Sequence, residues 1–184
     1  MDSFETAGCA ALATVSAVFQ IVHVGYPTPW GMWIDVVAIP WILAFFLFGW
    51  RGALTVSVLG ALIITLVAPA TWLGAFMKWI ATFPMWFMLW VWVKTFKLKL
   101  KDFSKLKIIL VCICLAVILR GLIVVPVNYY FAIPLWTGLT PEMAMQIVPW
   151  YIIVGLNIIQ GALEVLVAWL LMFRFGLVRF SLWG

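Results

Sequence analysis

A few strongly polar side chains interrupt the long apolar stretches of this chain, and they are its best candidates for chemistry. They are Lys78, Arg120, Asn128, Asn157, Gln160 and Glu164. An ionised side chain at the middle of a bilayer costs about 2.5–3.5 kcal/mol on insertion scales, so a chain that keeps such residues is expected to use them. As the lining of a cavity, they would bind a polar small molecule through hydrogen bonds and charge.

Composition places these residues in a membrane protein. The chain is 67% hydrophobic and 9% charged, whereas a soluble domain carries about 25% charged residues. A membrane-spanning helix needs about 20 residues, and only helices or closed barrels satisfy the backbone in lipid. We therefore predict an all-α, six-transmembrane-helix integral membrane bundle in a single domain, residues 1–184. Its expected spans lie near residues 6–24, 35–49, 52–68, 71–93, 107–131 and 149–173.

The basic residues in the gaps between spans predict how the chain lies in the plasma membrane. Lys and Arg gather on the cytoplasmic side of membrane proteins. The gaps 25–34, 69–70 and 132–148 contain neither residue, so we expect them outside and both termini in the cytoplasm. The two longer outer loops are rich in turn residues and are candidates for a lid over an outward-facing site. In the second, Thr140 followed by Pro141 predicts the start of a short helix. The basic residues on the expected inner side are Arg51, Lys94, Lys97, Lys99, Lys101, Lys105, Lys107, Arg174 and Arg179.

The polar residues fall into two groups according to their expected depth below the outer surface of the membrane. At about 1.5 Å per helical residue, several lie in the outer half of the bundle and are expected to bind a ligand. These are Asp35, Lys78, Asn128, Asn157 and Gln160. Aromatic side chains at the same level, expected to stack on a flat ring, are Trp33, Tyr129, Tyr130 and Trp150. The structural alternatives are that Lys78 snorkels to an interface and that the amides of the last span hold helices together.

Arg120 and Glu164 lie deeper, and opposite charges inside a membrane usually pair. We expect them to form a buried ion pair that clamps the fifth span to the sixth, and a part in the ligand site stays open. His23, near the outer end of the first span, is interpreted as an interfacial residue rather than a ligand.

Motifs for catalysis and metal binding are missing from the sequence. It contains no Walker-type Gly-rich loop, no G-x-S-x-G and no H-E-x-x-H, and its six acidic residues are scattered. The three Cys lack metal-ligand spacing and are interpreted as apolar fillers. We therefore expect no enzyme activity, no cofactor and no metal, and a partner that supplies energy. Two pairs of small residues in the first span, Ala7 with Ala11 and Ala13 with Ala17, would let another helix approach closely.

Four short segments, in order along the chain, share a pattern with a known family. They are Trp33–Pro40, Phe48–Ala53, Asn128–Tyr130 with the nearby Ile133–Leu135, and Gly155–Gly161. Together they resemble the substrate-binding S components of energy-coupling factor (ECF) vitamin transporters, most of all the riboflavin type. The departures from that pattern are Ala38 in place of an Asp, Gln160 in place of a Lys, and Lys78 near the place of an Asn.

The resemblance implies a mechanism. An S component captures a vitamin outside the cell, then docks on a transmembrane coupling subunit that carries two ATPases, and releases the vitamin inside. In the family an alanine-rich face of the first span makes the docking contact, and this face corresponds here to Ala13 and Ala17. The resemblance favours riboflavin as the ligand. The alternatives are another vitamin or precursor of the thiamine, pantothenate or queuosine type, or a membrane scaffold protein without a ligand.

Overall fold

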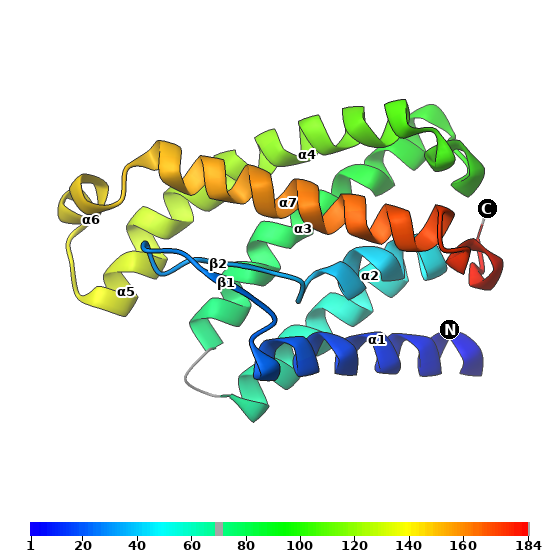
Figure 1. The fold of residues 1–184 in the computed structure, drawn as a ribbon, viewed down its shortest axis with the longest axis horizontal. Coiled ribbons are helices and arrows are strands. Elements are labelled where there is room, and N and C mark those ends of the chain that lie inside the picture. The colour runs from blue at the N-terminus through cyan, green and yellow to red at the C-terminus, as the bar shows by residue number, and fades with distance from the viewer. Residues whose placement is uncertain (69–71, 184) are drawn as a thin grey trace.

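The computed structural model describes residues 1–68 and 72–183. The long helices are α1 (Ser3–Val22), α2 (Ile39–Val67), α3 (Trp72–Phe96), α4 (Leu106–Val127) and α7 (Trp150–Phe173). Short elements connect them: β1 (Gly25–Pro27), β2 (Trp33–Asp35), η2 (Leu100–Ser104), η3 (Asn128–Ala132), α5 (Ile133–Thr137), α6 (Pro141–Ile147) and η4 (Leu177–Phe180). The fold is thus a helical bundle with one small antiparallel hairpin (Figure 1).

Five helices in the described part of the chain are long and apolar enough to cross a membrane. The chain is a multi-pass membrane protein. The expected gap 69–70 and the first residue of the span expected at 71–93 lie outside the described residues. The spans expected at 35–49 and 52–68 correspond to α2, which begins at Ile39 and not at residue 35.

Helix α2 is two helices joined at Gly49. This residue has φ 74° and ψ −165°, a conformation that side-chain-bearing residues rarely adopt. The two halves run back along each other, because a Cβ added to Gly60 in the second half would lie 2.7 Å from Trp41 Nε1 in the first. With α2 counted as two, the described residues form a bundle of six long helices. The sequence placed this break two residues later, at the basic gap.

The expected fifth span is longer than predicted. Helix α4 runs into the π-helical turn η3 and then into α5, so that one apolar segment extends from Leu106 to Thr137. Pro126 has no N–H to donate to the helical ladder, and the wider turn follows directly after it. Helix α6 begins where the sequence predicted, with Thr140 Oγ1 accepting a hydrogen bond from Met143 N at 3.4 Å.

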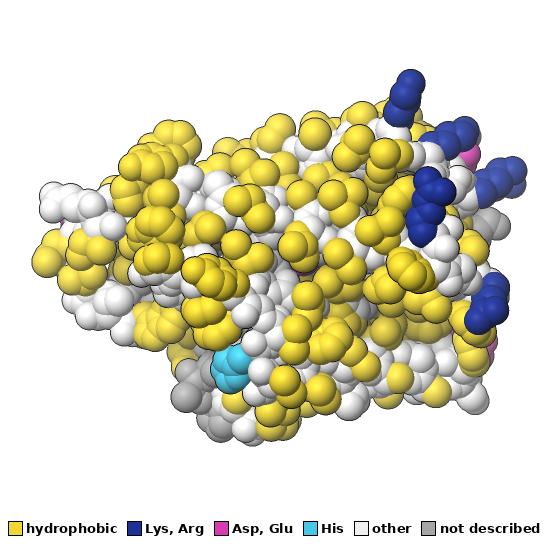
Figure 2. All heavy atoms as spheres, in the orientation of Figure 1, with side chains coloured by type: hydrophobic (Ala, Val, Ile, Leu, Met, Phe, Trp, Pro, Cys, Tyr) yellow, Lys and Arg dark blue, Asp and Glu magenta, His cyan; other side chains and the backbone are white. Residues whose placement is uncertain are grey.

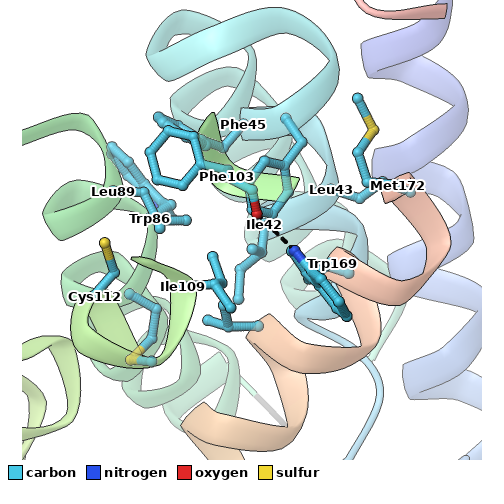
Figure 3. Packing of buried hydrophobic residues seen from close by; sticks show 14 of the residues in the cluster. Ile42, Leu43, Phe45, Trp86, Leu89, Phe103, Ile109, Cys112, Trp169 and Met172 are labelled. Atoms are coloured by element: carbon cyan, nitrogen blue, oxygen red, sulfur yellow. Dashed lines mark hydrogen bonds between the residues drawn. The ribbon is translucent and has the colours of Figure 1, made fainter. Parts of the chain in front are cut away.

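Both termini lie at the same end of the bundle (Figure 1). On the face shown in Figure 2, the Lys and Arg side chains gather at that end. The main hydrophobic core also lies there, built from the first half of α2, the end of α3, η2, the start of α4 and the end of α7. In this core Trp169 Nε1 donates to Phe103 O at 2.7 Å (Figure 3). This end of the bundle is thus filled by packed apolar side chains. The polar side chains that line the cavity lie toward the other end.

The hairpin β1–β2 covers the opposite half of the bundle. Gly25 pairs with Asp35 and Pro27 with Trp33. A Cβ on Gly25 would lie 2.6 Å from Asp35 Cβ, so only glycine lets the first strand pass so close to this carboxylate. The hairpin therefore places Asp35 above the helices instead of at the start of one.

Candidate ligand-binding site

A cavity of about 580 Å³ lies between the hairpin and the helices. Cavities that take small molecules measure about 300–1,000 Å³. Its walls come from the end of α1, the hairpin, α3, α4, α5, α6 and α7. The polar and ionisable side chains in the lining are Gln20, His23, Asp35, Lys78, Arg120, Asn128, Thr137, Asn157 and Gln160. The large aromatic side chains are Phe19, Trp30, Trp33 and Trp136.

Asp35 is held on three sides. Lys78 Nζ on α3 donates to Asp35 Oδ2, and Val37 N donates to Asp35 Oδ1 at 2.9 Å. The side-chain amide of Gln160 on α7 pairs with the Asp35 backbone. Gln160 Oε1 accepts from Asp35 N at 3.0 Å, and Gln160 Nε2 donates to Asp35 O at 2.8 Å. These bonds fasten the last residue of the hairpin to α3 and α7.

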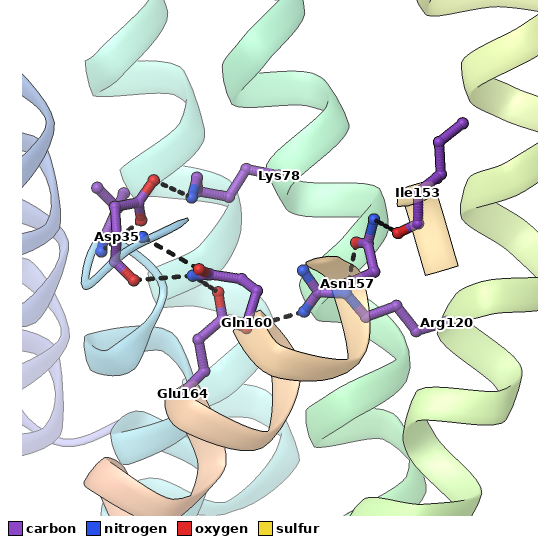
Figure 4. Close-up of polar contacts among 8 residues, drawn as sticks. Asp35, Lys78, Arg120, Ile153, Asn157, Gln160 and Glu164 are labelled. Carbon is purple, nitrogen blue, oxygen red and sulfur yellow. Dashed lines mark hydrogen bonds and ion pairs between the residues drawn. The ribbon is translucent and has the colours of Figure 1, made fainter. Parts of the chain in front are cut away.

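The network continues across α7 to α4 (Figure 4). Gln160 Nε2 also donates to Glu164 Oε1 at 2.7 Å, and Glu164 Oε2 accepts from Arg120 Nη1 at 3.0 Å. Arg120 Nε donates to Asn157 Oδ1 at 2.8 Å, and Asn157 Nδ2 donates to Ile153 O at 2.9 Å. The ion pair expected between Arg120 and Glu164 is thus present, and both side chains are buried.

Helical spacing explains how these side chains meet. Asn157, Gln160 and Glu164 are three and four residues apart, so they share one face of α7. Arg120 on α4 and Asn128 at the start of η3 are about two helical turns apart, and both line the cavity. Gly161 leaves the room that Arg120 fills, because a Cβ there would lie 3.2 Å from Arg120 Nη1.

The charges of the network balance. It holds two ion pairs, Lys78 with Asp35 and Arg120 with Glu164, and Gln160 bonds to the carboxylate residue of each pair. Buried charges are tolerated in a medium of low dielectric constant only when they are paired and hydrogen-bonded. Among the described residues no group of three His, Cys, Asp or Glu is placed to hold a metal ion. The cavity thus combines paired charges and amides with a largely apolar lining.

Not every residue proposed from the sequence reaches the cavity. Asp35, Lys78, Asn128, Asn157 and Gln160 line it, and so does Trp33. The remaining aromatic candidates, Tyr129, Tyr130 and Trp150, do not.

The reason is helical geometry. Successive residues of a helix point about 100° apart, so the consecutive Asn128, Tyr129 and Tyr130 cannot all face one cavity. Asn128 faces it and its Nδ2 donates to Val124 O at 2.8 Å. Tyr129 is buried with its hydroxyl donating to Val148 O at 2.6 Å. Tyr130 is 68% exposed, and Trp150, at 62%, borders a separate apolar groove between α4 and α7.

The docking residues inferred from the family lie on a packed face of the first helix. Ala13 and Ala17 are 0% and 3% exposed, because this face of α1 packs against α2. They offer no surface to a partner in this conformation. The alanines that α1 leaves exposed are Ala7, Ala10 and Ala11.

Sequence reasoning missed several lining residues. His23, interpreted as interfacial, has φ 55° and lies with its ring 5.4 Å from that of Trp33. Trp30 and Trp136 come from the two loops expected to cover the site. An aromatic residue in each of those turn-rich loops was the available signal, although loop conformation alone decides which way such a ring points.

Comparison with known proteins was made by sequence and by structure. No model of a known protein family matches the chain, and no curated protein matches it in sequence. Among solved structures, it is similar to one described as the S component of a bacterial ECF transporter. The TM-score is 0.75 at 20% sequence identity, and the match covers 95% of this chain and 96% of that one. The two proteins share a fold over nearly their whole length.

Proposed function

We propose that this chain is the substrate-capturing S component of an ECF-type importer, a transport subunit and not an enzyme. The observation that carries the proposal is a cavity with polar and charged side chains in its lining, in a bundle that shares its fold with an S component along 95% of its length. The four short segments that resemble the same family support it independently. Three residues of the site's network, Asp35, Asn157 and Gln160, lie within those segments, whereas Lys78, Arg120 and Glu164 lie outside them.

The proposed direction of capture follows from charge. On the face shown in Figure 2, the Lys and Arg side chains gather at the end that carries both termini, and basic loops favour the cytoplasmic side. The cavity lies toward the other end, beneath the hairpin, α5 and α6. With this orientation the site faces outward, where a scarce nutrient is captured.

Riboflavin is the ligand we propose. A planar ring would lie among Trp30, Trp33 and Trp136, because aromatic faces stack on flat heterocycles. The network of amides and charges would hydrogen-bond the ring edge or the hydroxyl chain. The volume of about 580 Å³ suits a molecule of this kind.

Another vitamin or precursor on the same scaffold is the second candidate. Gln160 replaces a Lys of the riboflavin-type pattern, and Lys78 stands near the place of an Asn. Both substitutions lie in the cavity lining. A change at Lys78 alters the donors that a ligand meets, and a change at Gln160 alters the residues that its amide holds in place.

The proposed partners are a transmembrane coupling subunit and two ATPase subunits. The family uses a face of small residues on the first helix for this contact. Since Ala13 and Ala17 are buried, we place the contact on the exposed side of α1, at Ala7, Ala10 and Ala11. Small side chains there allow the close helix approach that association in lipid requires.

The test is to purify the protein in mild detergent, identify small molecules that co-purify, and titrate riboflavin while following Trp fluorescence. We expect a bound flavin and saturable quenching. A Lys78→Met variant should bind more weakly, whereas Lys101→Met, a lysine at the opposite end, should bind like the wild type. Protein that carries no small molecule and shows no response to any vitamin would be a scaffold, and the proposal would fail.

A further inference from the structure

Arg120 keeps one edge of its guanidinium free of protein partners. Its Nε is bonded to Asn157 and its Nη1 to Glu164. Its Nη2 forms no hydrogen bond with the described residues. This atom is not fully buried and keeps some accessible surface. Arg120 is 3% exposed overall and lines the cavity, so the remaining surface of Nη2 faces that cavity. Figure 4 shows the guanidinium directed from α4 toward Gln160.

Glu164 stands on the other side of the guanidinium. It is 0% exposed and is absent from the lining. A guanidinium has five N–H donors in a fixed planar fork. Two of them are used to orient the group, and the others remain for an acceptor. This is the arrangement of a positioned binding residue rather than of a clamp that is satisfied within the protein.

Gln160 shows the opposite situation. Both hydrogens of Nε2 are donated, one to Asp35 O and one to Glu164 Oε1. Its Oε1 accepts from Asp35 N, which also fixes the orientation of the amide. Gln160 therefore has no donor left for a ligand, although it lines the cavity. Its work is to hold the hairpin and Glu164 in place.

Most of the hydrogen-bonding groups that the protein leaves unused in the cavity are donors. Lys78 Nζ has three hydrogens and one protein partner, Asp35. Asp35 accepts hydrogen bonds at both carboxylate oxygens, from Lys78 and from Val37 N. A ligand in this site therefore meets two cations whose unused N–H groups face it, whereas one of the two balancing carboxylates points elsewhere.

We propose that Arg120 is a ligand-binding residue and that, with Lys78, it selects a neutral or anionic ligand rich in hydrogen-bond acceptors. Carbonyl groups, ring nitrogens or a carboxylate would supply the acceptors. A cationic ligand is disfavoured, because it would face two positive groups. This inference rests on the proposed function and narrows the class of its substrate.

The first test uses the wild-type protein and three probes: riboflavin, which has an acceptor-rich ring edge, pantothenate, which has a carboxylate, and thiamine, which is a cation. We expect riboflavin or pantothenate to bind at least roughly 100-fold more tightly than thiamine, in keeping with the rejection of a ligand that leaves buried polar groups unpaired. Tight binding of thiamine, or a cation that co-purifies, overturns the inference but leaves an S component. No binding of any probe and no co-purifying molecule overturns the proposed function itself.

The second test compares two variants with the probe that binds best. Arg120→Lys keeps a positive charge but loses the fork, and we expect its Kd to rise roughly 10- to 100-fold, the range for a hydrogen bond to a charged group. Glu164→Gln keeps every Arg120 donor but removes a charge that orients it, so its Kd should rise less than that of Arg120→Lys while its melting temperature falls. Arg179→Lys, an exposed arginine at the opposite end of the bundle, is the matched control and should bind like the wild type. Equal loss of affinity in Arg120→Lys and Glu164→Gln, as a clamp would give, or an unchanged Kd in Arg120→Lys, overturns the inference. If Glu164→Gln does not fold, Arg120→Lys, its control and the probe series still decide.

Discussion

Replacing Gln160 with Leu tests the network at its centre. The side-chain amide of Gln160 holds the end of the hairpin to α7 through Asp35 N and Asp35 O, and it holds Glu164 as well. Leu has a similar volume but no polar atoms. We therefore expect the variant to fold with a looser hairpin and a less stable bundle.

The magnitude follows from the three lost bonds. A neutral hydrogen bond contributes about 0.5–1.5 kcal/mol net, and one to a charged group about 1.5–3 kcal/mol. Two of the bonds from Gln160 go to the backbone of Asp35 and the third goes to the carboxylate of Glu164. Together they are worth about 2.5–6 kcal/mol. For a chain of this length, about 2–4 °C of melting temperature corresponds to each kcal/mol, so the fall should be about 10 °C.

Two measurements check this prediction. Thermal unfolding in detergent reports the stability, and hydrogen exchange of a peptide that spans residues 25–38 reports the hairpin. The Asp35 amide loses its acceptor in the variant and should exchange faster. The matched control is Gln146→Leu on α6, an exposed residue whose side chain makes no hydrogen bond within the described residues. The control should melt like the wild type. A Gln160→Leu variant that matches it in both measurements would refute the network.

Three further predictions concern packing, charge and docking. Gly161→Ala should lower stability by about 1–3 kcal/mol and weaken ligand binding, because its Cβ would crowd the buried guanidinium; Gly155→Ala, with open space around it, is the control and should be neutral or better in thermal unfolding. A double-mutant cycle of Asp35→Asn and Lys78→Met should give a coupling energy of about 1–3 kcal/mol, and a coupling near zero would contradict the ion pair. Ala11→Trp should abolish uptake in cells without changing ligand affinity in detergent, and equal loss of both would place that residue in the core.

The long helices could be predicted because hydropathy decides them. A run of apolar residues about 20 long has few alternatives to a spanning helix. The pairing of Arg120 with Glu164 could be predicted for a similar reason, since two opposite charges at the same depth have little else to bind. The start and end of α7, Trp150 and Phe173, differ from the expected span by one residue at most.

The hairpin could not be predicted, because its residues do not alternate between apolar and polar over a useful length. The strands have three residues each. Their pairing depends on Gly25 passing close to Asp35, a contact visible only in three dimensions. For this reason the sequence predicted Asp35 at the start of a helix. No pattern in the sequence indicated that Gln160 would bond to the backbone of Asp35.

Helix phase explains the other differences. Ala7, Ala11, Ala13 and Ala17 all have the small size that close packing requires, but nothing in the spacing says which pair faces inward. The structure puts Ala13 and Ala17 against α2. In the same way, the π-helical turn after Pro126 fixes which of three consecutive polar residues faces the cavity. Such rotations leave the hydropathy pattern unchanged.

The arrangement of charges explains how so apolar a protein keeps cations at a binding site. Unpaired, Lys78 or Arg120 would be strongly disfavoured in surroundings of low dielectric constant. Each is paired with a carboxylate that uses one of its donors, and Gln160 links the two pairs through Asp35 and Glu164. The pairing satisfies the protein without using up the cations, so donors remain for a ligand. Because Asp35 belongs to the hairpin, the element that covers the cavity is fastened by the same bonds that keep those donors in place.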